Sequence, residues 1–429
     1  MTQTSEIFDG FLANLGVDNG ATIASRRDEI TKALNKEFRS IEGSTDHKLM
    51  VGSYGRWTAI RGVSDLDLLF IVPPSLRRGY EEDGGASRIL KRTREAIQNR
   101  YPTTTVRVDR LVVVVEFISF SFDVQPVFAN DDDSYSYPDT YADAWKVTKP
   151  RAEIKAIRDE NETARGNLRR LCRMTRSWKN KHGVVMGGLL IDTLASRFFK
   201  AEPDWAAEGS DGFGLMCEAF FDFLAQEPDH EFYAAVGSGQ RVKVKKRFQS
   251  AAADARDLAS IAVGARDQKN EYAKWRAVFG RSVPKVQHAG EEASFSKFSD
   301  TEEFIEDQFP IDIRASLEID CTVTQDGFRP QLLRTLLRKS MPLRPQKQLQ
   351  FTIVECTVVE PFVVRWKVLN RGAEAERRDC IRGTLIEPNK GRDRTEYTSF
   401  RGAHVVECYI IKAGVVIARA SIDVPISGT

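Results

Sequence analysis

The chain has 429 residues, enough for two or three domains at about 150 residues each. Hydrophobic residues make up 41% and charged residues 29%, which is typical of folded globular proteins and argues against disorder. The formal net charge of +2 does not by itself favour a nucleic-acid or membrane partner. No apolar run approaches the roughly 20 residues of a membrane helix. The N-terminus also lacks a signal-peptide pattern, so we expect a cytoplasmic protein.

The cysteines and histidines are dispersed, and no C-x-x-C pair occurs. This spacing argues against a zinc site and favours reduced thiols that pack as small buried hydrophobic groups. The six cysteines are Cys172, Cys217, Cys321, Cys356, Cys380 and Cys408.

The first 160 residues alternate between helical and strand patterns. Apolar residues at helical spacing predict helices over 5–17, 22–41 and 87–100. Short apolar or alternating runs predict strands over 48–53, 67–72, 104–108, 111–117 and 119–127, with a hairpin turn at Asp109-Arg110. We therefore predict a mixed α/β domain over 1–160.

The rest of the chain divides into a helical and a β-rich part. The spacing of apolar residues over 161–280 predicts helices, among them 189–199, 213–224, 242–262 and 270–279. The basic run 242–247 is interpreted as a solvated helix start, and an electrostatic footing for a nucleic-acid activator stays open. Residues 281–310 resemble a linker in composition. Strands are predicted over 352–359, 362–369, 403–411 and 415–424, so 311–429 should form a β-rich, sandwich-like domain.

A Gly-Ser turn followed by two carboxylates is the strongest chemical signal in the chain. Gly52-Ser53 ends one strand, and Asp65 and Asp67 open the next. Side chains two residues apart in a strand point to the same face, so the two carboxylates should project together. Two such carboxylates can hold Mg²⁺, and the turn can offer N–H groups and a hydroxyl to a triphosphate. These groups are the ones that nucleotidyl transfer requires.

A third carboxylate would complete such a site. Asp123 lies in the alternating strand 119–127, where an acid needs a cation or a hydrogen-bond partner to offset its desolvation. Glu116 is the rival, but a single polar residue in an apolar run is often the solvent-facing side of an edge strand. We therefore favour Asp123.

The order of these motifs resembles the polymerase-β-like nucleotidyltransferase superfamily, with Asp123 at the third family carboxylate. Within that superfamily, residues 52–67 look like the bacterial cGAS/DncV-like nucleotidyltransferases, kin of oligoadenylate synthase. Residues 167–179 look like the helix that follows their catalytic core. A Lys that contacts the donor triphosphate commonly stands there two residues before a Trp, and this chain has Arg176. Residues 366–372 and 402–410 are similar to an adenylyl/guanylyl-cyclase-and-SMODS-type sensor domain.

The resemblance implies an α+β enzyme that joins ATP or other NTPs into cyclic di- or trinucleotides and releases pyrophosphate. It implies a role in anti-phage signalling, in which the product activates an effector protein. The metal would be two Mg²⁺ ions, with Mn²⁺ as the alternative, and the catalytic metal ligands would be Asp65, Asp67 and Asp123. The residues that grip the NTP would be Gly52, Ser53, Arg176 and Lys179. The ligand of the C-terminal domain is not specified by the sequence.

Two other functions stay open on the sequence. One is a nucleotidyltransferase of the same superfamily that modifies RNA, a protein or a small molecule. The other is a non-catalytic nucleotide-binding sensor, against which the presence of all three acids argues.

Overall fold

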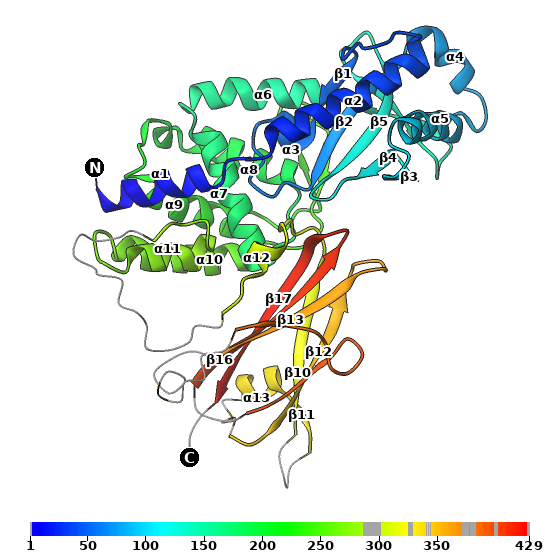
Figure 1. Ribbon diagram of the computed structural model, residues 1–429. Coiled ribbons are helices and arrows are strands. Elements are labelled where there is room, and N and C mark those ends of the chain that lie inside the picture. The colour runs from blue at the N-terminus through cyan, green and yellow to red at the C-terminus, as the bar shows by residue number, and fades with distance from the viewer. Residues whose placement is uncertain are drawn as a thin grey trace. The chain divides into compact units, whose positions relative to one another are not determined.

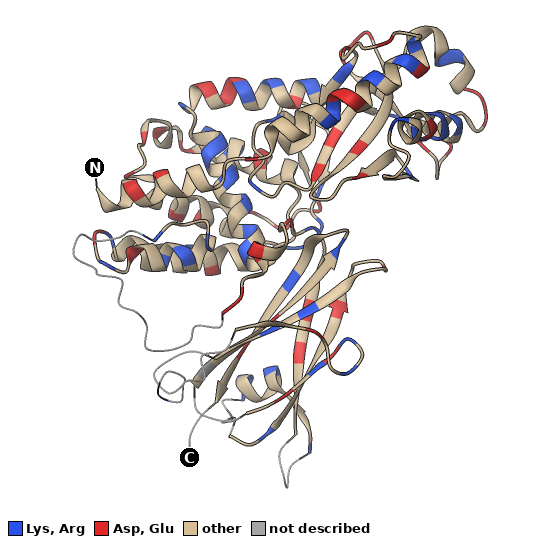
Figure 2. Cartoon of the chain, viewed as in Figure 1, with Lys and Arg blue, Asp and Glu red and all other residues tan. Residues whose placement is uncertain are grey.

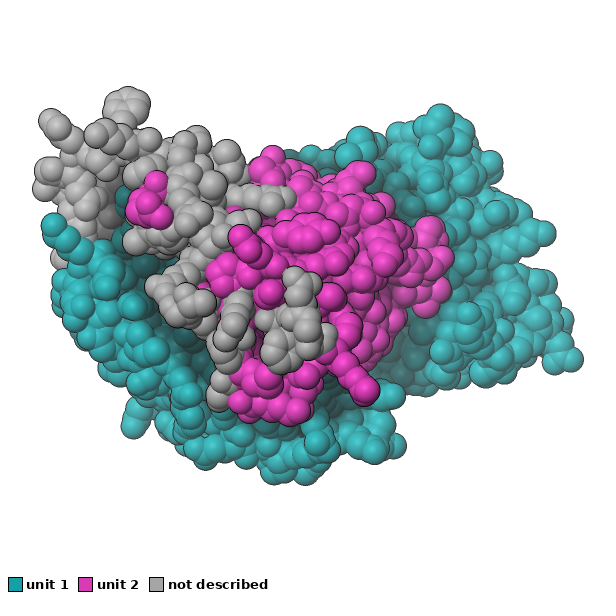
Figure 3. All heavy atoms as spheres, turned by 90° about the horizontal axis from the view of Figure 1, so that it is seen from below, with its two compact units in different colours: residues 1–181, 186–286 teal, residues 182–185, 287–429 magenta. Residues whose placement is uncertain are grey.

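The computed structural model describes residues 2–285, 302–324, 329–339, 341, 343, 345–370, 377, 383–398 and 402–426. The chain divides into two compact units (Figures 1 and 3). Unit 1 comprises residues 1–181 and 186–286, whereas unit 2 comprises 182–185 and 287–429. Within the part of the chain described, no helix combines the length and apolar character that a bilayer crossing requires.

Unit 1 begins with two helices and a mixed sheet. Its elements through the sheet are α1 (Gln3–Asn14), α2 (Gly20–Arg39), β1 (Lys48–Met50), α3 (Gly52–Gly55), β2 (Asp65–Ile71), α4 (Arg77–Tyr80), α5 (Gly85–Arg100), β3 (Thr105–Asp109), β4 (Val112–Glu116), β5 (Ser121–Ala129), β6 (Tyr135–Asp139) and β7 (Ala144–Thr148). The sheet order is β1-β2-β5-β4-β3, and β6 and β7 extend from β5. β2 and β5 run parallel, while the other neighbouring strands are antiparallel.

Strand alternation decides which face of this sheet is buried. In β2, Leu66, Leu68 and Phe70 point to one face, and they pack with apolar side chains of α2 and α5 into one hydrophobic core. The helices α2 and α5 thus cover that face of the sheet (Figure 1). Asp65 and Asp67 alternate with these residues and therefore lie on the other face. The fold thus removes the apolar side of β2 from water and leaves its acidic side partly accessible.

The second half of unit 1 is mainly helical. It contains α6 (Pro150–Thr163), α7 (Asn167–His182, whose last residue belongs to unit 2), α8 (Gly188–Ala201), α9 (Phe213–Gln226), β8 (Phe232–Ala234), β9 (Arg241–Lys243), α10 (Gln249–Gly264) and α11 (Glu271–Phe279). Aromatic rings hold α1 against this lobe, since Phe8 lies 4.9 Å from Trp275 and Phe11 lies 4.9 Å from Phe279 between ring centroids. The N-terminal helix therefore packs against a helix from the far end of unit 1 in sequence.

Unit 2 contains two antiparallel four-stranded sheets. Its elements are α12 (Ile305–Gln308), β10 (Leu317–Thr324), β11 (Gln331–Leu332), α13 (Leu333–Arg338), β12 (Gln348–Cys356), β13 (Val363–Leu369), β14 (Leu385–Ile386), β15 (Arg394–Tyr397), β16 (Gly402–Lys412) and β17 (Val415–Ile426). The sheet orders are β11-β10-β12-β15 and β14-β13-β16-β17. Side chains from both sheets form one core, in which Trp366 and Phe351 are fully buried. The predicted α+β class with a sandwich-like β-rich part is confirmed.

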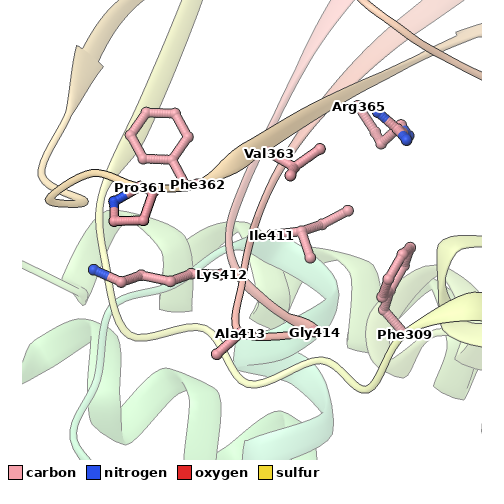
Figure 4. Close-up of a pocket in the computed structure, with 9 residues that line it drawn as sticks. All are labelled: Phe309, Pro361, Phe362, Val363, Arg365, Ile411, Lys412, Ala413 and Gly414. Carbon is pink, nitrogen blue, oxygen red and sulfur yellow. The ribbon is translucent and has the colours of Figure 1, made fainter. Parts of the chain in front are cut away.

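A pocket of about 420 Å³ opens on unit 2 between the start of β13 and the β16–β17 turn (Figure 4). Its lining is largely apolar, with Phe309, Phe362, Val363 and Ile411 around the hollow. Both cations at its rim are engaged: Arg365 pairs with Glu387 at 3.0 Å, and Lys412 donates to a backbone carbonyl. The pocket is therefore an apolar hollow whose charged groups are already satisfied.

Some sequence-based expectations about the elements were wrong or incomplete. Residues 242–248 do not begin a helix; they contain β9 and a loop, and α10 starts at Gln249. The alternating Val242 and Val244 of that basic run suit a short hairpin strand, which pairs with β8. The strands β6 and β7 and the helix α6 were not predicted. Most of the expected linker, 286–301, and Cys380 lie outside the described residues.

Three residues in the segments of unit 2 that resemble a sensor domain are buried. Trp366 and Tyr409 lie in its apolar clusters. His404 has its Nδ1 3.0 Å from Oδ1 of Asn370, which is typical of a hydrogen-bonded structural histidine.

Candidate functional site

Three carboxylates lie on two neighbouring strands of the unit 1 sheet. β2 and β5 pair in parallel with Asp67 directly opposite Asp123 and Asp65 opposite Ser121. Residues paired across a sheet share a face, so Asp65, Asp67 and Asp123 all project from the face opposite α2 and α5. All three are partly exposed, and the Ser121 hydroxyl donates a hydrogen bond to Oδ1 of Asp65 at 3.2 Å.

Glu116 projects from the same face but is already paired. It lies opposite Ser121, on β4, and Nε of Arg107 on the adjacent strand β3 contacts its Oε1 at 3.0 Å. Its partner is therefore a neighbouring side chain at the end of the hairpin. Asp123, by contrast, faces Asp67 across the strand pair.

The Gly52-Ser53 turn lies directly against this carboxylate face. Val51 N–H donates to the carbonyl of Asp67 at 3.0 Å, and the chain then turns into the short helix α3. Gly52 has φ of +62°, and a Cβ built there would overlap Oδ2 of Asp67. Only glycine provides both the left-handed backbone and the space for this carboxylate. The turn and Asp67 are thus in van der Waals contact.

The turn is anchored to the helical lobe by a buried ion network. Arg56, the residue after α3, places Nε 2.8 Å from Oδ2 of Asp192 on α8, and Nη1 of Arg176 on α7 lies 2.8 Å from Oδ1 of the same carboxylate. Arg56 also lies 3.6 Å from Glu153 of α6, and the hydroxyl of Thr58 donates to Asp192 at 3.1 Å. Asp192 has no solvent exposure. One carboxylate therefore joins the turn to both α7 and α8.

Burial and charge act in opposite directions on the two acids of this network. Burial is the largest influence on Asp192 and would raise its pKa, but the nearby Arg176 and Arg56 outweigh it and lower the pKa below the ordinary value. Burial is also the largest influence on Glu153, and there it raises the pKa despite the attraction of Arg56. The Asp192 carboxylate is thus stabilised as an anion, whereas Glu153 takes up a proton more readily than a free glutamate.

The structure brings Arg176 close to the predicted phosphate turn. A Cβ at Gly188, the first residue of α8, would lie 3.1 Å from Nη2 of Arg176 and 3.9 Å from Cβ of Ser53. The guanidinium also donates to the carbonyl oxygens of Cys172 and Gly188. Arg176 is therefore beside Ser53 and is also part of the anchoring network.

Three other cations of unit 1 differ in their surroundings. Lys179, predicted to grip the NTP, lies one turn further along α7 and is buried. Arg56, which lies between the Gly-Ser turn and the two carboxylates in the chain, is buried and ion-paired. Arg61 is about half-exposed and pairs with Asp18.

The donor set on the sheet face suits a hard divalent cation. Carboxylate oxygens are the ligands that Mg²⁺ prefers, and three of them project from adjacent positions of β2 and β5. In the described residues no ready-made cluster of three or more acidic, histidine or cysteine ligands is present. The three carboxylates would therefore have to come closer together to enclose an ion.

Asp192 was missed by the sequence-based interpretation. It lies in the apolar segment 189–199, where a single carboxylate among leucines and phenylalanines requires a cationic partner. The sequence therefore did contain a signal for Asp192: an acid isolated among apolar residues, which is also the signal that indicated Asp123. The identity of the partners, Arg56 and Arg176, could not be read from the sequence, because they lie 136 residues before it and on the preceding helix, respectively.

Comparisons with known proteins identify two domains. Residues 1–161 match the Second Messenger Oligonucleotide or Dinucleotide Synthetase (SMODS) domain, and residues 299–427 match the Adenylyl/Guanylyl and SMODS C-terminal sensor domain. A Cyclic AMP-AMP-AMP synthase from Acinetobacter sp. is 21% identical over 261 residues, which are 56% of this chain and 73% of that protein.

Solved structures with partial likeness cover about two thirds of the chain. The Escherichia coli MS115-1 CdnC:HORMA-deltaN complex gives a TM-score of 0.49 at 16% identity, covering 65% of this chain and 98% of the other. Vibrio cholerae DncV cyclic AMP-GMP synthase with a linear intermediate gives 0.46 at 13% identity, covering 66% and 89%.

Proposed function

We propose, from the premise that this chain joins a SMODS nucleotidyltransferase domain to a C-terminal sensor domain of the adenylyl/guanylyl and SMODS type, that it links NTPs into a cyclic oligonucleotide. The reaction would release pyrophosphate at each bond. The acceptor is a ribose hydroxyl of one nucleotide, and the electrophile is the α-phosphorus of another.

One observation carries this proposal: Asp67 faces Asp123 across β2 and β5 while its carboxylate contacts Gly52 of the turn. A nucleotidyl transfer site needs acidic groups beside a place for the donor phosphates. Here both features meet at one residue.

Several residues of unit 1 would each have a separate role in the transfer. The first N–H groups of α3, starting at Gly52, have no acceptor within the helix and can donate to phosphate oxygens together with the Ser53 hydroxyl. Asp192 fixes Arg56 and Arg176, so it holds the turn and α7 in one arrangement. Asp123 would accept the proton of the attacking hydroxyl at a carboxylate oxygen. Divalent metal ions bound by Asp65, Asp67 and Asp123 would supply charge neutralisation and a lower hydroxyl pKa.

The test is a product analysis with matched variants. Purified full chain would be incubated with Mg²⁺, and in parallel Mn²⁺, and with every pair of labelled NTPs, followed by pyrophosphate measurement and chromatography. We expect pyrophosphate release and a phosphatase-resistant product without free ends. Asp67→Asn should lower the rate by at least about 100-fold, because losing even a partner of a metal ligand costs about 10- to 100-fold. Asp131→Asn, an exposed acid of the same unit, should keep the rate.

Other outcomes would contradict the proposal in defined ways. A nucleotide attached to RNA, a protein or a small molecule would assign the chain to acceptor modification. Failure of the wild type to release pyrophosphate from any NTP mixture would favour a nucleotide-binding sensor. An Asp67→Asn variant with the wild-type rate would remove Asp67 from the chemistry.

The cellular role belongs to the same proposal. Two of the relatives are named for cyclic nucleotide products, and a third is a complex with HORMA-deltaN. We extend this to anti-phage signalling, in which the product activates an effector and unit 2 binds the controlling ligand. Loss of phage resistance in cells that carry Asp67→Asn, but not Asp131→Asn, would support that role.

A further inference from the structure

The loop that joins α7 to α8 lies partly in unit 2. Residues 182–185 belong to unit 2, although the rest of α7 and all of α8 belong to unit 1. Val184, Val185 and Met186 are buried, and Val185 packs in an apolar cluster with Val416 of β17. Close-packed segments transmit a displacement to their neighbours. This loop is therefore not a slack linker between the two helices.

The start of the loop is fixed against β17 of unit 2. Gly183 has φ of +69°, and a Cβ built there would lie 2.5 Å from the carbonyl oxygen of Arg419 and 3.2 Å from its Cγ. A side chain cannot approach a backbone oxygen so closely, so glycine alone suits both the left-handed backbone and the space. Gly183 is therefore in van der Waals contact with the backbone of β17.

Arg419 is itself held in place by buried neighbours. It is 7% exposed, its Nη2 donates to Oε1 of Glu407 at 2.7 Å, and its guanidinium carbon lies 5.2 Å from the ring centroid of Tyr409. The Tyr409 hydroxyl in turn donates to Oε2 of Glu407 at 2.7 Å, and Tyr409 pairs with Arg419 in the β16–β17 ladder. Breaking a buried ion pair is strongly unfavourable. Arg419 thus gives Gly183 a rigid support.

The other end of the loop lies in the candidate site of unit 1. The Gly188 carbonyl accepts a hydrogen bond from Nη2 of Arg176 at 3.0 Å, and a Cβ at Gly188 would lie 3.9 Å from Cβ of Ser53. Basic residues mark much of the visible length of α7 (Figure 2), and one of them, Arg176, pairs with Asp192 of α8. The loop therefore ends beside two residues that were predicted to grip the NTP.

The covalent path between these two ends is short. Val185 and Gly188 are three residues apart, and an extended chain spans at most about 3.3–3.6 Å per residue, which gives about 10–11 Å. Only Met186 and Gly187 separate the residue packed in unit 2 from the residue beside the phosphate turn. A displacement at Gly183 or Val185 is therefore carried to Gly188.

We propose that Gly183 and Arg419 are positioning residues of the transfer reaction. Their contact in unit 2 holds the loop where Gly188 keeps Arg176 beside Ser53. This inference rests on the proposed function, in which Ser53 and Arg176 bind the donor phosphates, and it makes that binding depend on unit 2. Coupling between two sites is reciprocal. Donor phosphates bound in unit 1 therefore also stabilise β17 in unit 2.

Hydrogen exchange on the wild-type full chain tests this reciprocity. The probe is an equimolar mixture of the four NTP analogues that carry a methylene group between the α- and β-phosphorus, with Mg²⁺, so every base is offered and no pyrophosphate leaves. Binding should protect the amides of α3, which adjoin the donor phosphates. It should also raise the protection of β17 amides around Arg419 at least about fivefold, the lower end of usual coupling factors.

A matched pair of variants isolates the contact. Gly183→Ala places a methyl group against the Arg419 carbonyl and displaces the loop. Pyrophosphate release at limiting NTP should fall about tenfold and recover in part at saturating NTP, because the loop ends at the phosphate turn. The effect of the analogues on β17 should disappear. Gly391→Ala, at a glycine of unit 2 with φ of +63° and open space around a Cβ, should match the wild type in both measurements.

Two results would overturn the inference. One is a wild type in which the analogues protect α3 but leave β17 unchanged; this result needs no variant, so it decides even if Gly183→Ala fails to fold. The other is a Gly183→Ala chain that circular dichroism shows folded and whose KM and kcat equal those of the wild type. Either can occur while pyrophosphate release still depends on Asp67. A wild type with neither α3 protection nor pyrophosphate release would instead contradict the proposed function, and this inference with it.

Discussion

Asp192 shows how a single buried charge can organise a site without touching a substrate. It is fully enclosed and joins Arg56 after the phosphate turn to Arg176 of α7. A buried charge of this kind can be retained because it specifies one arrangement of its partners, as much as because it stabilises the fold. Removing one member of the network leaves the buried charges of the others uncompensated. The turn and two helices would lose their common anchor together.

Replacing Asp192 by Asn should therefore be strongly destabilising. The variant removes the carboxylate that pairs with Arg176 and the nearer of the two that pair with Arg56, and we expect a loss of about 3–5 kcal/mol in the free energy of unfolding. Urea denaturation measures this change. Asp159→Asn removes an exposed pair with Lys155 and should leave the free energy of unfolding nearly unchanged. A comparably small loss for Asp192→Asn would show that the network does not stabilise the fold.

Glu153 should give the protein a pH dependence of opposite sign to that of most carboxylates. Its folded-state pKa is raised by burial, so the folded protein binds this proton more tightly than the unfolded chain. Stability from this group is present below the unfolded pKa of about 4.3 and is lost as pH rises through the folded pKa. A tenfold difference in proton affinity between the two states corresponds to about 1.4 kcal/mol in the free energy of unfolding.

The Glu153→Gln variant should lack that decline. Denaturation midpoints of the wild type and the variant, measured at intervals from about pH 4 to pH 8, should diverge in favour of the variant as pH increases. Glu162→Gln, at an exposed position of the same helix, should follow the wild type. Parallel curves for wild type and Glu153→Gln would refute the raised pKa. Asp192 has a lowered pKa and acts in the other direction. Its contribution to the free energy of unfolding is present above the unfolded pKa of about 3.9 and is lost as pH falls through the lower pKa of the folded state.

At the scale of elements, the strand pair β2–β5 and the Gly52-Ser53 turn at the start of α3 depend on one another. The turn must pass close to Asp67, and the parallel register then sets Asp67 against Asp123. A one-residue shift of that register would move the acids to the helix-covered face. The apolar alternation of β2 and β5 prevents the shift, because it would expose Leu66, Leu68 and Phe122.

Gly52→Ala should test this dependence. A Cβ at Gly52 would collide with Oδ2 of Asp67 and would strain a left-handed backbone, so Asp67 must move. We expect pyrophosphate release to fall by at least about 100-fold, as for loss of a positioned catalytic group. Gly79→Ala, at a position with open space and no positive φ, should keep the wild-type rate. An active Gly52→Ala variant would show that the contact with Asp67 is not required.

At the scale of the whole molecule, unit 2 contains a short piece from the middle of the chain. Residues 182–185, which follow the main body of α7, belong to unit 2. Val185 is 7% exposed and lies in a cluster with Ile305, Ile313, Tyr409 and Val416. The connection between α7 and α8 is therefore part of the unit 2 core, and both of those helices carry residues of the candidate site.

Val185→Ala should destabilise unit 2 selectively. The cavity left in this cluster should cost about 2 kcal/mol. Hydrogen exchange should show lower protection for amides of β16 and β17, while β2 and β5 keep theirs. Val359→Ala, at a 75% exposed position of unit 2, is the matched control. Equal loss of protection in the unit 1 sheet would show that 182–185 do not belong to unit 2 alone.

Local patterns in the sequence determined most of the elements. The alternation in β5 and the Asp109-Arg110 hairpin were predicted correctly, because side-chain period and turn chemistry are local properties. The strands β6 and β7 escaped prediction, since their polar, proline-containing sequence becomes strand-like only when β5 provides a partner. The basic run before α10 was predicted to be the start of the helix 242–262 from the helical pattern of that segment, but the run pairs with β8 as a strand.

For the candidate site, the sequence by itself determined that Asp65 and Asp67 share a face and that a Gly-Ser turn precedes them, since both depend only on near neighbours. The sequence also indicated Asp123, through the desolvation cost of an acid in an alternating strand. Only the tertiary structure decided that Asp67 lies opposite Asp123, that Asp192 joins Arg56 to Arg176, and that Arg169 and Arg173 lack acidic partners among the residues described. These features involve residues far apart in the chain, and their contacts are fixed by strand register and helix packing, which leave no local signature.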